Sequence, residues 1–175
     1  MLHNKYEEIA DTDYKMIEAY INKPEVTQWY VNAFKSFNLN GIDLGKWHWS
    51  WWAFFGSVFF LLYRKSYTAA AVLSGLLIIG WFIPFGWMIL WILSGGYSTY
   101  FVYKTYKEKY LEIQEANLED ENKNLEMMQA LGGTNEWAIV VGILAQLFFW
   151  GSAIFMIGFS LTFLGIILTV LFNVT

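Results

Sequence analysis

Few residues of this chain are of a type and spacing that could perform chemistry. The chain has no cysteine, so disulfides, thiolate metal ligands and cysteine nucleophiles are excluded. Its only histidines, His3 and His48, are far apart in the sequence, which argues against a metal site. We interpret carboxylates in the charged stretches as surface charge, among them Glu7, Glu8, Glu112 and Glu115. We therefore expect no catalytic residue, no metal and no cofactor, and the chain is not expected to be an enzyme.

Arg64 and Lys65 form a basic pair between two apolar stretches. Such a pair can bind anionic lipid, at about 1 kcal/mol per residue. It can also act as a stop and orientation signal during membrane insertion. The two interpretations are compatible, and both make Arg64 and Lys65 candidate lipid or topology anchors.

Gln146 is the most polar side chain well inside the last apolar tract. Between helices it could form a hydrogen bond worth about 0.6–2 kcal/mol. A transport role is less expected, because no carboxylate or base accompanies it. Gly151 and Gly158, with Gly165 after a further seven residues, could form a close-packing seam, provided that the chain does not turn near Gly158.

The composition indicates which kind of fold must position these residues. Of the 175 residues, 57% are hydrophobic and 15% are charged, whereas about 25% are charged in a soluble domain. Between residues 47 and 103 only Arg64 and Lys65 are charged, and residues 137–175 carry no charge. A soluble helix needs a polar face that these tracts cannot supply, and a charge at the bilayer centre costs about 2.5–3.5 kcal/mol. The sequence therefore predicts an all-α integral membrane protein, and its net charge of −4 gives no basic surface for nucleic acid.

Residues 1–46 are expected to form a cytoplasmic amphipathic helical region. A first helix is predicted over residues 5–21. A second begins at Pro24, whose missing N–H costs nothing in the first turn of a helix. The second helix carries an apolar stripe at helical spacing, which the first helix, the bilayer surface or a partner must cover. The candidate partner-binding residues of this stripe are Val26, Trp29, Tyr30, Phe34 and Phe37.

Residues 47–66 are predicted to form an aromatic helix that lies in the membrane interface or enters the bilayer and returns. Its apolar part, 47–63, is at the low end of the length needed to span. Trp47, Trp49, Trp51 and Trp52 are typical of a headgroup belt, which makes them further candidate anchors. In the alternative, 47–63 spans the membrane, and either the N-terminal region or the basic pair lies outside.

Two further apolar tracts are each too long for one spanning helix. Residues 67–103 would form a helix of about 55 Å against a hydrocarbon core of about 30 Å. A transmembrane hairpin is therefore predicted there, with its turn in the Gly- and Pro-containing stretch 80–87. Residues 136–175 have the same length problem, so a second hydrophobic hairpin is predicted, turning near Gly158 or at Gly151-Ser152. Residues 104–135 between them are predicted to form an acidic cytoplasmic helix, either a docking arm or a solvated connector.

Positive charges indicate the sides of the membrane, because lysine and arginine favour the cytoplasmic side. They flank the first hairpin at both ends, at Arg64-Lys65 and at Lys104, Lys107 and Lys109. This pattern predicts a multi-pass protein of four spans with both termini cytoplasmic.

The aromatic segment also resembles a known signature. Residues 51–55, Trp-Trp-Ala-Phe-Phe, are followed by Leu-Leu-Tyr-Arg-Lys-Ser-Tyr at 61–67. This pattern is similar to that of the small bacterial inner-membrane family called domain of unknown function 2628, and the similarity covers residues 20–150. Val58 stands where that family has proline, and Ser66 where it usually has methionine. The resemblance implies a protein of the bacterial cytoplasmic (inner) membrane but no chemistry, because the family has no assigned activity.

These expectations favour a non-enzymatic membrane adaptor or scaffold. Membrane lipid would be one partner, and a protein or a second copy of the chain, contacted through the cytoplasmic helices, would be another. The alternative is a small transporter subunit or an oligomeric pore, whose pathway the short spans and the aromatic segment would line. The lack of charged residues in the spans argues against this alternative.

Overall fold

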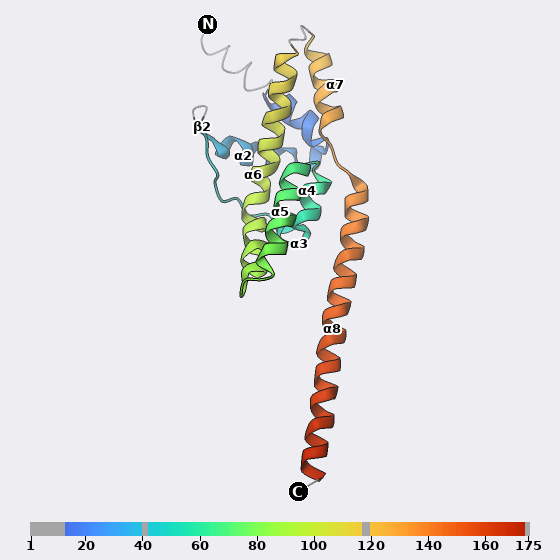
Figure 1. Cartoon of the computed structure of the whole chain (residues 1–175). Coiled ribbons are helices and arrows are strands. Elements are labelled where there is room, and N and C mark those ends of the chain that lie inside the picture. Colours follow the sequence, from blue (N-terminus) through green and yellow to red (C-terminus); the bar gives the residue numbers. More distant parts are fainter. Residues whose placement is uncertain (1–12, 40–41, 117–119, 174–175) are drawn as a thin grey trace. The chain divides into compact units, whose positions relative to one another are not determined.

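Two compact units, Met1–Ile139 and Val140–Thr175, make up the computed structural model of this protein. The structure describes residues 13–39, 42–116 and 120–173, and most of them are helical (Figure 1). The all-α class predicted from the sequence is confirmed. A short antiparallel strand pair, with Asn38 opposite Asp43 and Leu39 opposite Ile42, also occurs.

The elements of the first unit follow one another with short connections. Residues 13–21 are helical, whereas residues 5–12 of the predicted first helix lie outside the described residues. Next come α2 (Pro24–Phe37), β1 (Asn38–Leu39), β2 (Ile42–Asp43), α3 (Trp51–Gly56), α4 (Val58–Tyr63), α5 (Tyr67–Gly80), α6 (Gly86–Glu115) and α7 (Glu121–Leu131). The last helix, α8 (Glu136–Asn173), begins in the first unit and continues through the second.

The core of the first unit forms where α2 packs against the carboxyl-terminal half of α6. The ring centroids of Phe34 and Tyr106 lie 5.3 Å apart, and those of Phe37 and Tyr103 lie 5.7 Å apart. Tyr20, from the helix over residues 13–21, packs edge-on against Tyr106 at 5.3 Å. Aromatic pairs of this kind contribute about 0.5–1.5 kcal/mol each beyond their buried area.

The prediction that the apolar stripe of α2 binds a partner is therefore wrong for its central residues. Tyr30, Phe34 and Phe37 are buried, and Val26 is half-buried against the same core. The protein's own helices supply the cover that the amphipathic pattern requires. Trp29 stays partly exposed and packs edge-on against His48, with ring centroids 4.7 Å apart.

The prediction of one aromatic helix over residues 47–66 is also wrong. Residues 44–50 are neither helix nor strand, and the helical part is divided into α3 and α4 of six residues each. Ser50 begins α3 because its Oγ accepts a hydrogen bond from the backbone N–H of Ala53 at 3.2 Å. Ser57 separates the two helices with a φ of 44°. Each helix is only about 9 Å long, so neither could cross a bilayer.

The turn predicted within residues 67–103 is confirmed. α5 ends at Gly80 and α6 begins at Gly86. The chain reverses through Pro84 and through Phe85, whose φ is 60°. The two arms meet so closely that a Cβ on Gly86 would lie 2.6 Å from the carbonyl oxygen of Gly80. Glycine is needed at such an approach.

Residues 104–135 do not form the single helix that was predicted. α6 continues from the hairpin to Glu115, and α7 begins separately at Glu121. Asp120 caps α7, because its Oδ1 accepts a hydrogen bond from the backbone N–H of Asn122 at 3.0 Å. The acidic segment is therefore two helices, and the first of them is an extension of the hairpin.

Residues 136–175 do not form the predicted second hairpin. α8 runs without a break from Glu136 to Asn173, over 38 residues. Glycine in a helix costs only about 1 kcal/mol relative to alanine, and the tract contains no proline to enforce a turn. Apolar side chains cannot satisfy the backbone groups that a turn would expose, which also favours an unbroken helix.

By length and composition, one helical stretch among the described residues could cross a membrane, Glu121–Phe148. It includes the non-helical residues 132–135, so its apolar part is the beginning of α8. Tyr67–Gly80 and Ile154–Ile166 are shorter apolar helices.

Candidate functional site

Trp47, one of the candidate anchors, lies against a glycine pair on α6. The backbone N–H of His48 donates a hydrogen bond to the carbonyl oxygen of Gly96 at 2.9 Å. A Cβ on Gly96 would come within 2.5 Å of the Trp47 ring, and one on Gly95 would come within 2.9 Å of Trp49. Segment 47–50 is thus fixed against α6 at a distance that only glycine permits.

Trp51 and Trp52 are more exposed than Trp47, which is 46% exposed although it packs on α6. Trp52 is 83% exposed, and Trp51 is 63% exposed. Their helix α3 is held to α6 because the indole N–H of Trp91 donates to the carbonyl oxygen of Phe54. The four predicted tryptophan anchors therefore divide into a pair packed on α6 and an outward pair that remains a candidate for membrane contact.

Arg64 is not at the surface. Its side chain is 5% exposed, and its Nη1 donates a hydrogen bond to the carbonyl oxygen of Ile21 at 3.2 Å. The guanidinium also lies 4.6 Å from the ring centroid of Tyr30 and 5.3 Å from that of Tyr63. Ile21 ends the helix over residues 13–21, where the negative end of the helix dipole favours a cation.

The prediction that Arg64 is a lipid anchor is therefore wrong, because the protein covers its guanidinium. Within the described part of the chain, no carboxylate forms an ion pair with it. Burial raises the pKa of the neighbouring Tyr20 hydroxyl although Arg64 acts to lower it, so Tyr20 stays protonated at neutral pH. Lys65 is only half-buried, with a φ of 55°, and remains a candidate anchor. The effect of the pair on topology stays a prediction.

An ionic cluster that the sequence did not indicate joins β2 to α6. Lys107 Nζ donates to both carboxylate oxygens of Asp43, at 2.7 and 2.8 Å, and the hydroxyl of Tyr103 donates to Oδ1 at 2.7 Å. The hydrogen bond from Lys107 holds the pKa of the Asp43 carboxyl below its ordinary value. Asp43 lies 60 positions from Tyr103 and 64 from Lys107 in the sequence, and no local pattern pairs it with them.

The predicted packing residues of the second unit lie on one helix. Because α8 is continuous, Gly151, Gly158 and Gly165 recur at seven residues along a single face. A Cβ at any of them would meet nothing within 4 Å. Gln146 is half-buried on the same helix. The packing role of these residues stays a prediction.

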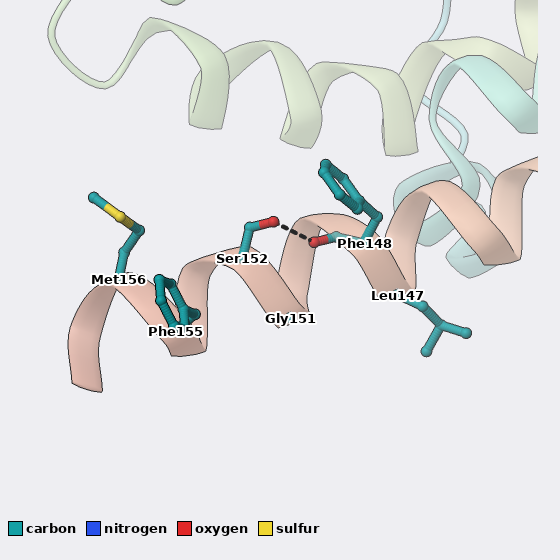
Figure 2. Close-up of a pocket in the computed structure, with 6 residues that line it drawn as sticks. All are labelled: Leu147, Phe148, Gly151, Ser152, Phe155 and Met156. Atoms are coloured by element: carbon teal, nitrogen blue, oxygen red, sulfur yellow. Dashed lines mark hydrogen bonds between the residues drawn. The ribbon is translucent and has the colours of Figure 1, made fainter. Parts of the chain in front are cut away.

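A shallow hollow surrounds Gly151 (Figure 2). The Oγ of Ser152 donates to the carbonyl oxygen of Phe148 at 2.7 Å, so this hydroxyl is used within the helix. All of the lining residues belong to α8: Leu147, Phe148, Gly151, Ser152, Phe155 and Met156. A hollow with one helix as its wall does not enclose a ligand, and we assign no binding site to it.

Among the described residues, no three His, Asp or Glu side chains gather as metal ligands would. His48 packs against Trp29 and Phe37, and burial lowers the pKa of its imidazole. The ring is therefore neutral at pH 7. The described residues of this region include the exposed pair Trp51 and Trp52 and the side chains that pack behind them.

No protein-family model, curated protein or solved structure matches this chain. The resemblance of residues 51–67 to domain of unknown function 2628 therefore remains an expectation from those residues alone.

Proposed function

We propose that this protein is a non-enzymatic membrane adaptor, anchored by α8, whose acidic helices bind a protein partner. The observation that carries the proposal is α8 itself: 38 helical residues with no charge after Glu136. Large apolar side chains along it are exposed, among them Ile143, Phe155 and Leu161. Such a surface is stable in lipid and costly in water.

A continuous α8 changes the proposed topology. At roughly 1.5 Å per residue α8 is about 57 Å long, enough to cross a hydrocarbon core of about 30 Å once. A single crossing would place residues 1–135 and the carboxyl end of α8 on opposite sides, instead of both termini in the cytoplasm. All of the lysine and arginine residues lie in the first unit, and this favours the cytoplasmic side for it. The bacterial inner membrane is proposed from the signature resemblance.

The docking surface in this proposal is the acidic region 104–131. It contains seven carboxylates and four lysines. The side chains of Glu112 and Glu121 are each more than half exposed. Lys107 is already engaged by Asp43 within the fold. We therefore propose a partner with a basic surface, because the negatively charged region 104–131 attracts positive charge.

Two measurements test the proposal. The full chain should float with lipid vesicles and resist extraction from membranes at alkaline pH. A photo-crosslinker at exposed Leu111 should then give one partner adduct in cells, and Glu112→Lys with Glu115→Lys and Glu126→Lys should remove it. Glu25→Lys on α2 is the matched control and should leave the adduct unchanged.

Three results would contradict the adaptor. They are a chain that stays monomeric in buffer without detergent, an adduct that survives the three charge reversals, and solute flux through sealed vesicles that contain only this protein. The last result would favour the transporter or pore.

A further inference from the structure

The tip of the α5–α6 hairpin is exposed and uncharged. From Gly75 to Leu93 the sequence contains no charged residue and no serine, threonine, asparagine or glutamine. Phe82 is 83% exposed and Phe85 is 70% exposed, and Trp81 is exposed beside them. The tip lies at the opposite end of the first unit from α7 (Figure 1). An apolar exposed surface of this kind marks an interaction site.

Most of the backbone N–H groups of the turn at this tip are hydrogen-bonded within the turn itself. The N–H groups of Trp81, Phe82, Ile83 and Gly86 all donate to carbonyl oxygens three or four residues earlier, at 2.9–3.3 Å. Pro84 has no N–H to satisfy. Turns in water can leave such groups to solvent, whereas in hydrocarbon each unsatisfied group costs several kcal/mol. The turn therefore leaves few N–H groups to be satisfied when it is placed in lipid.

The part of the hairpin between its tip and Trp47 matches the thickness of one leaflet, and α5 is somewhat longer. α5 has 14 residues and is about 21 Å long. On the other arm, the Trp47 ring lies over Gly96, about 15 Å from the start of α6 at Gly86. Tryptophan favours the headgroup layer, and one leaflet contributes about 15 Å of hydrocarbon. With Trp47 at the headgroups, the tip would therefore reach the midplane and fall short of the opposite surface.

We propose that the α5–α6 hairpin is re-entrant: it inserts into one leaflet, ends near the bilayer midplane and does not cross. The ligand of this surface is the acyl-chain region of that leaflet. Lys65 and Lys104 are the first charged residues that the chain reaches from the tip along each arm, and both would lie at or above the headgroups on the aqueous side. This inference rests on the proposed membrane function and replaces the two crossings predicted for residues 67–103.

The experiment uses the full chain in sealed phosphatidylcholine vesicles. Because the protein has no cysteine, Phe82→Cys gives a single reactive position on a side chain that packs little. Membrane-impermeant maleimide should fail to label it from either side and should label it after detergent is added. A fluorophore attached there should be quenched most by lipids brominated near the ends of their acyl chains. Val72→Cys, which is eight residues above the end of α5, should report a position shallower by about 12 Å.

Ile42→Cys on exposed β2 is the control, and it should be labelled from one side and not quenched. Labelling of Phe82→Cys from the side opposite to Ile42→Cys would show a crossing hairpin and overturn the proposal. Labelling from the same side, or quenching only by shallow bromines, would overturn it equally. Failure of the whole chain to float with vesicles would instead overturn the proposed membrane function.

Discussion

Arg64 and Lys65 are neighbours in the sequence but lie in different environments. The guanidinium of Arg64 is enclosed by Tyr30, Tyr63 and the carbonyl oxygen of Ile21, whereas Lys65 is half-exposed at a left-handed turn. A planar guanidinium can stack on a ring and donate in its own plane, which an ammonium group cannot do. At the residue scale, Arg64 therefore joins the helix over residues 13–21 to α2 and α4.

Arg64→Ala should lower the free energy of unfolding by about 3 kcal/mol, because it removes desolvated cation–π contacts and a charged hydrogen bond. Arg64→Lys should recover less than half of this loss. Unfolding in detergent, followed by near-ultraviolet circular dichroism, would measure both. Lys65→Gly removes the adjacent charge, tolerates positive φ, and should have little effect. Equal losses for the Arg64→Ala and Lys65→Gly variants would contradict the assignment.

We expect the contribution of Asp43 to the free energy of unfolding to depend on pH. Its pKa is lower in the folded state than in the unfolded chain, where it is about 3.9, mainly because Lys107 donates to it. The stability from this pair is therefore complete above the unfolded pKa and is lost as the pH falls through the folded pKa. Asp43→Asn should cost about 0.5–1 kcal/mol at neutral pH.

The cost of Asp43→Asn should shrink progressively as the pH is lowered below about 4. Denaturant titrations of both proteins at neutral and acidic pH would measure it. Glu121→Gln, at a more exposed and longer contact with Lys15, is the comparison and should cost less than Asp43→Asn at neutral pH. A cost for Asp43→Asn that does not change with pH would rule out the carboxylate as its source.

At the scale of elements, α6 organises the first unit because it contacts different partners along its length. Its first turns form the hairpin with α5, its Gly95-Gly96 pair receives the 47–50 segment, and its tyrosines receive α2. At the glycine pair a Cβ on Gly96 would lie 2.5 Å from the Trp47 ring, so the contact is close. The lack of side chains at Gly95 and Gly96 lets Trp47 and Trp49 pack directly on the α6 backbone.

Gly96→Ala should destabilise the protein by about 1–3 kcal/mol, because its new Cβ would collide with the Trp47 ring. The displaced tryptophan should also be quenched more readily by soluble acrylamide. Gly75→Ala is the matched control in α5, where a Cβ would meet nothing within 4 Å. That control should be neutral or stabilising by up to about 1 kcal/mol. If both substitutions gave the same change, the close packing at Gly96 would be refuted.

Local patterns predicted local structure well. The proline and the apolar spacing gave the start of α2 and its buried face, and the Gly- and Pro-containing stretch gave the turn before α6. The unbroken α8 was not predicted, because residues 136–175 exceed the length of one spanning helix. Glycine and serine are the only turn-forming residues near the middle of this tract, and they are not enough to break the helix. The burial of Arg64 and the pairing of Asp43 with Lys107 were missed because they depend on contacts between distant segments, which periodicity does not encode.

At the scale of the whole molecule, charge is distributed very unevenly. Charged residues are frequent up to Lys46 and from Lys104 to Glu136, and residues 137–175 have none. In the proposed membrane setting, α8 depends on this lack of charge, because lipid must solvate it along its length.

Ile154→Lys should weaken membrane retention, because a charge near the middle of a spanning helix costs about 2.5–3.5 kcal/mol. Ile154 is exposed and lies in the middle of α8, so the substitution does not disturb a packed core. Alkaline extraction of membranes would compare the released fractions. Ile42→Lys, on exposed β2, should leave retention unchanged. Full retention of the Ile154→Lys protein would contradict the spanning role of α8.

The four residues before α8, 132–135, connect this helix mechanically to the rest of the first unit. The backbone N–H of Gly133 donates to the carbonyl oxygen of Tyr20 at 2.7 Å, and that of Asn135 donates to the carbonyl oxygen of Tyr63 at 2.8 Å. Tension applied along the last helix would thus be transmitted to the ends of two other helices at once, through peptide groups on either side of the Arg64 contacts. If α8 spans a membrane as proposed, a stretched or thickened bilayer would pull first on this junction.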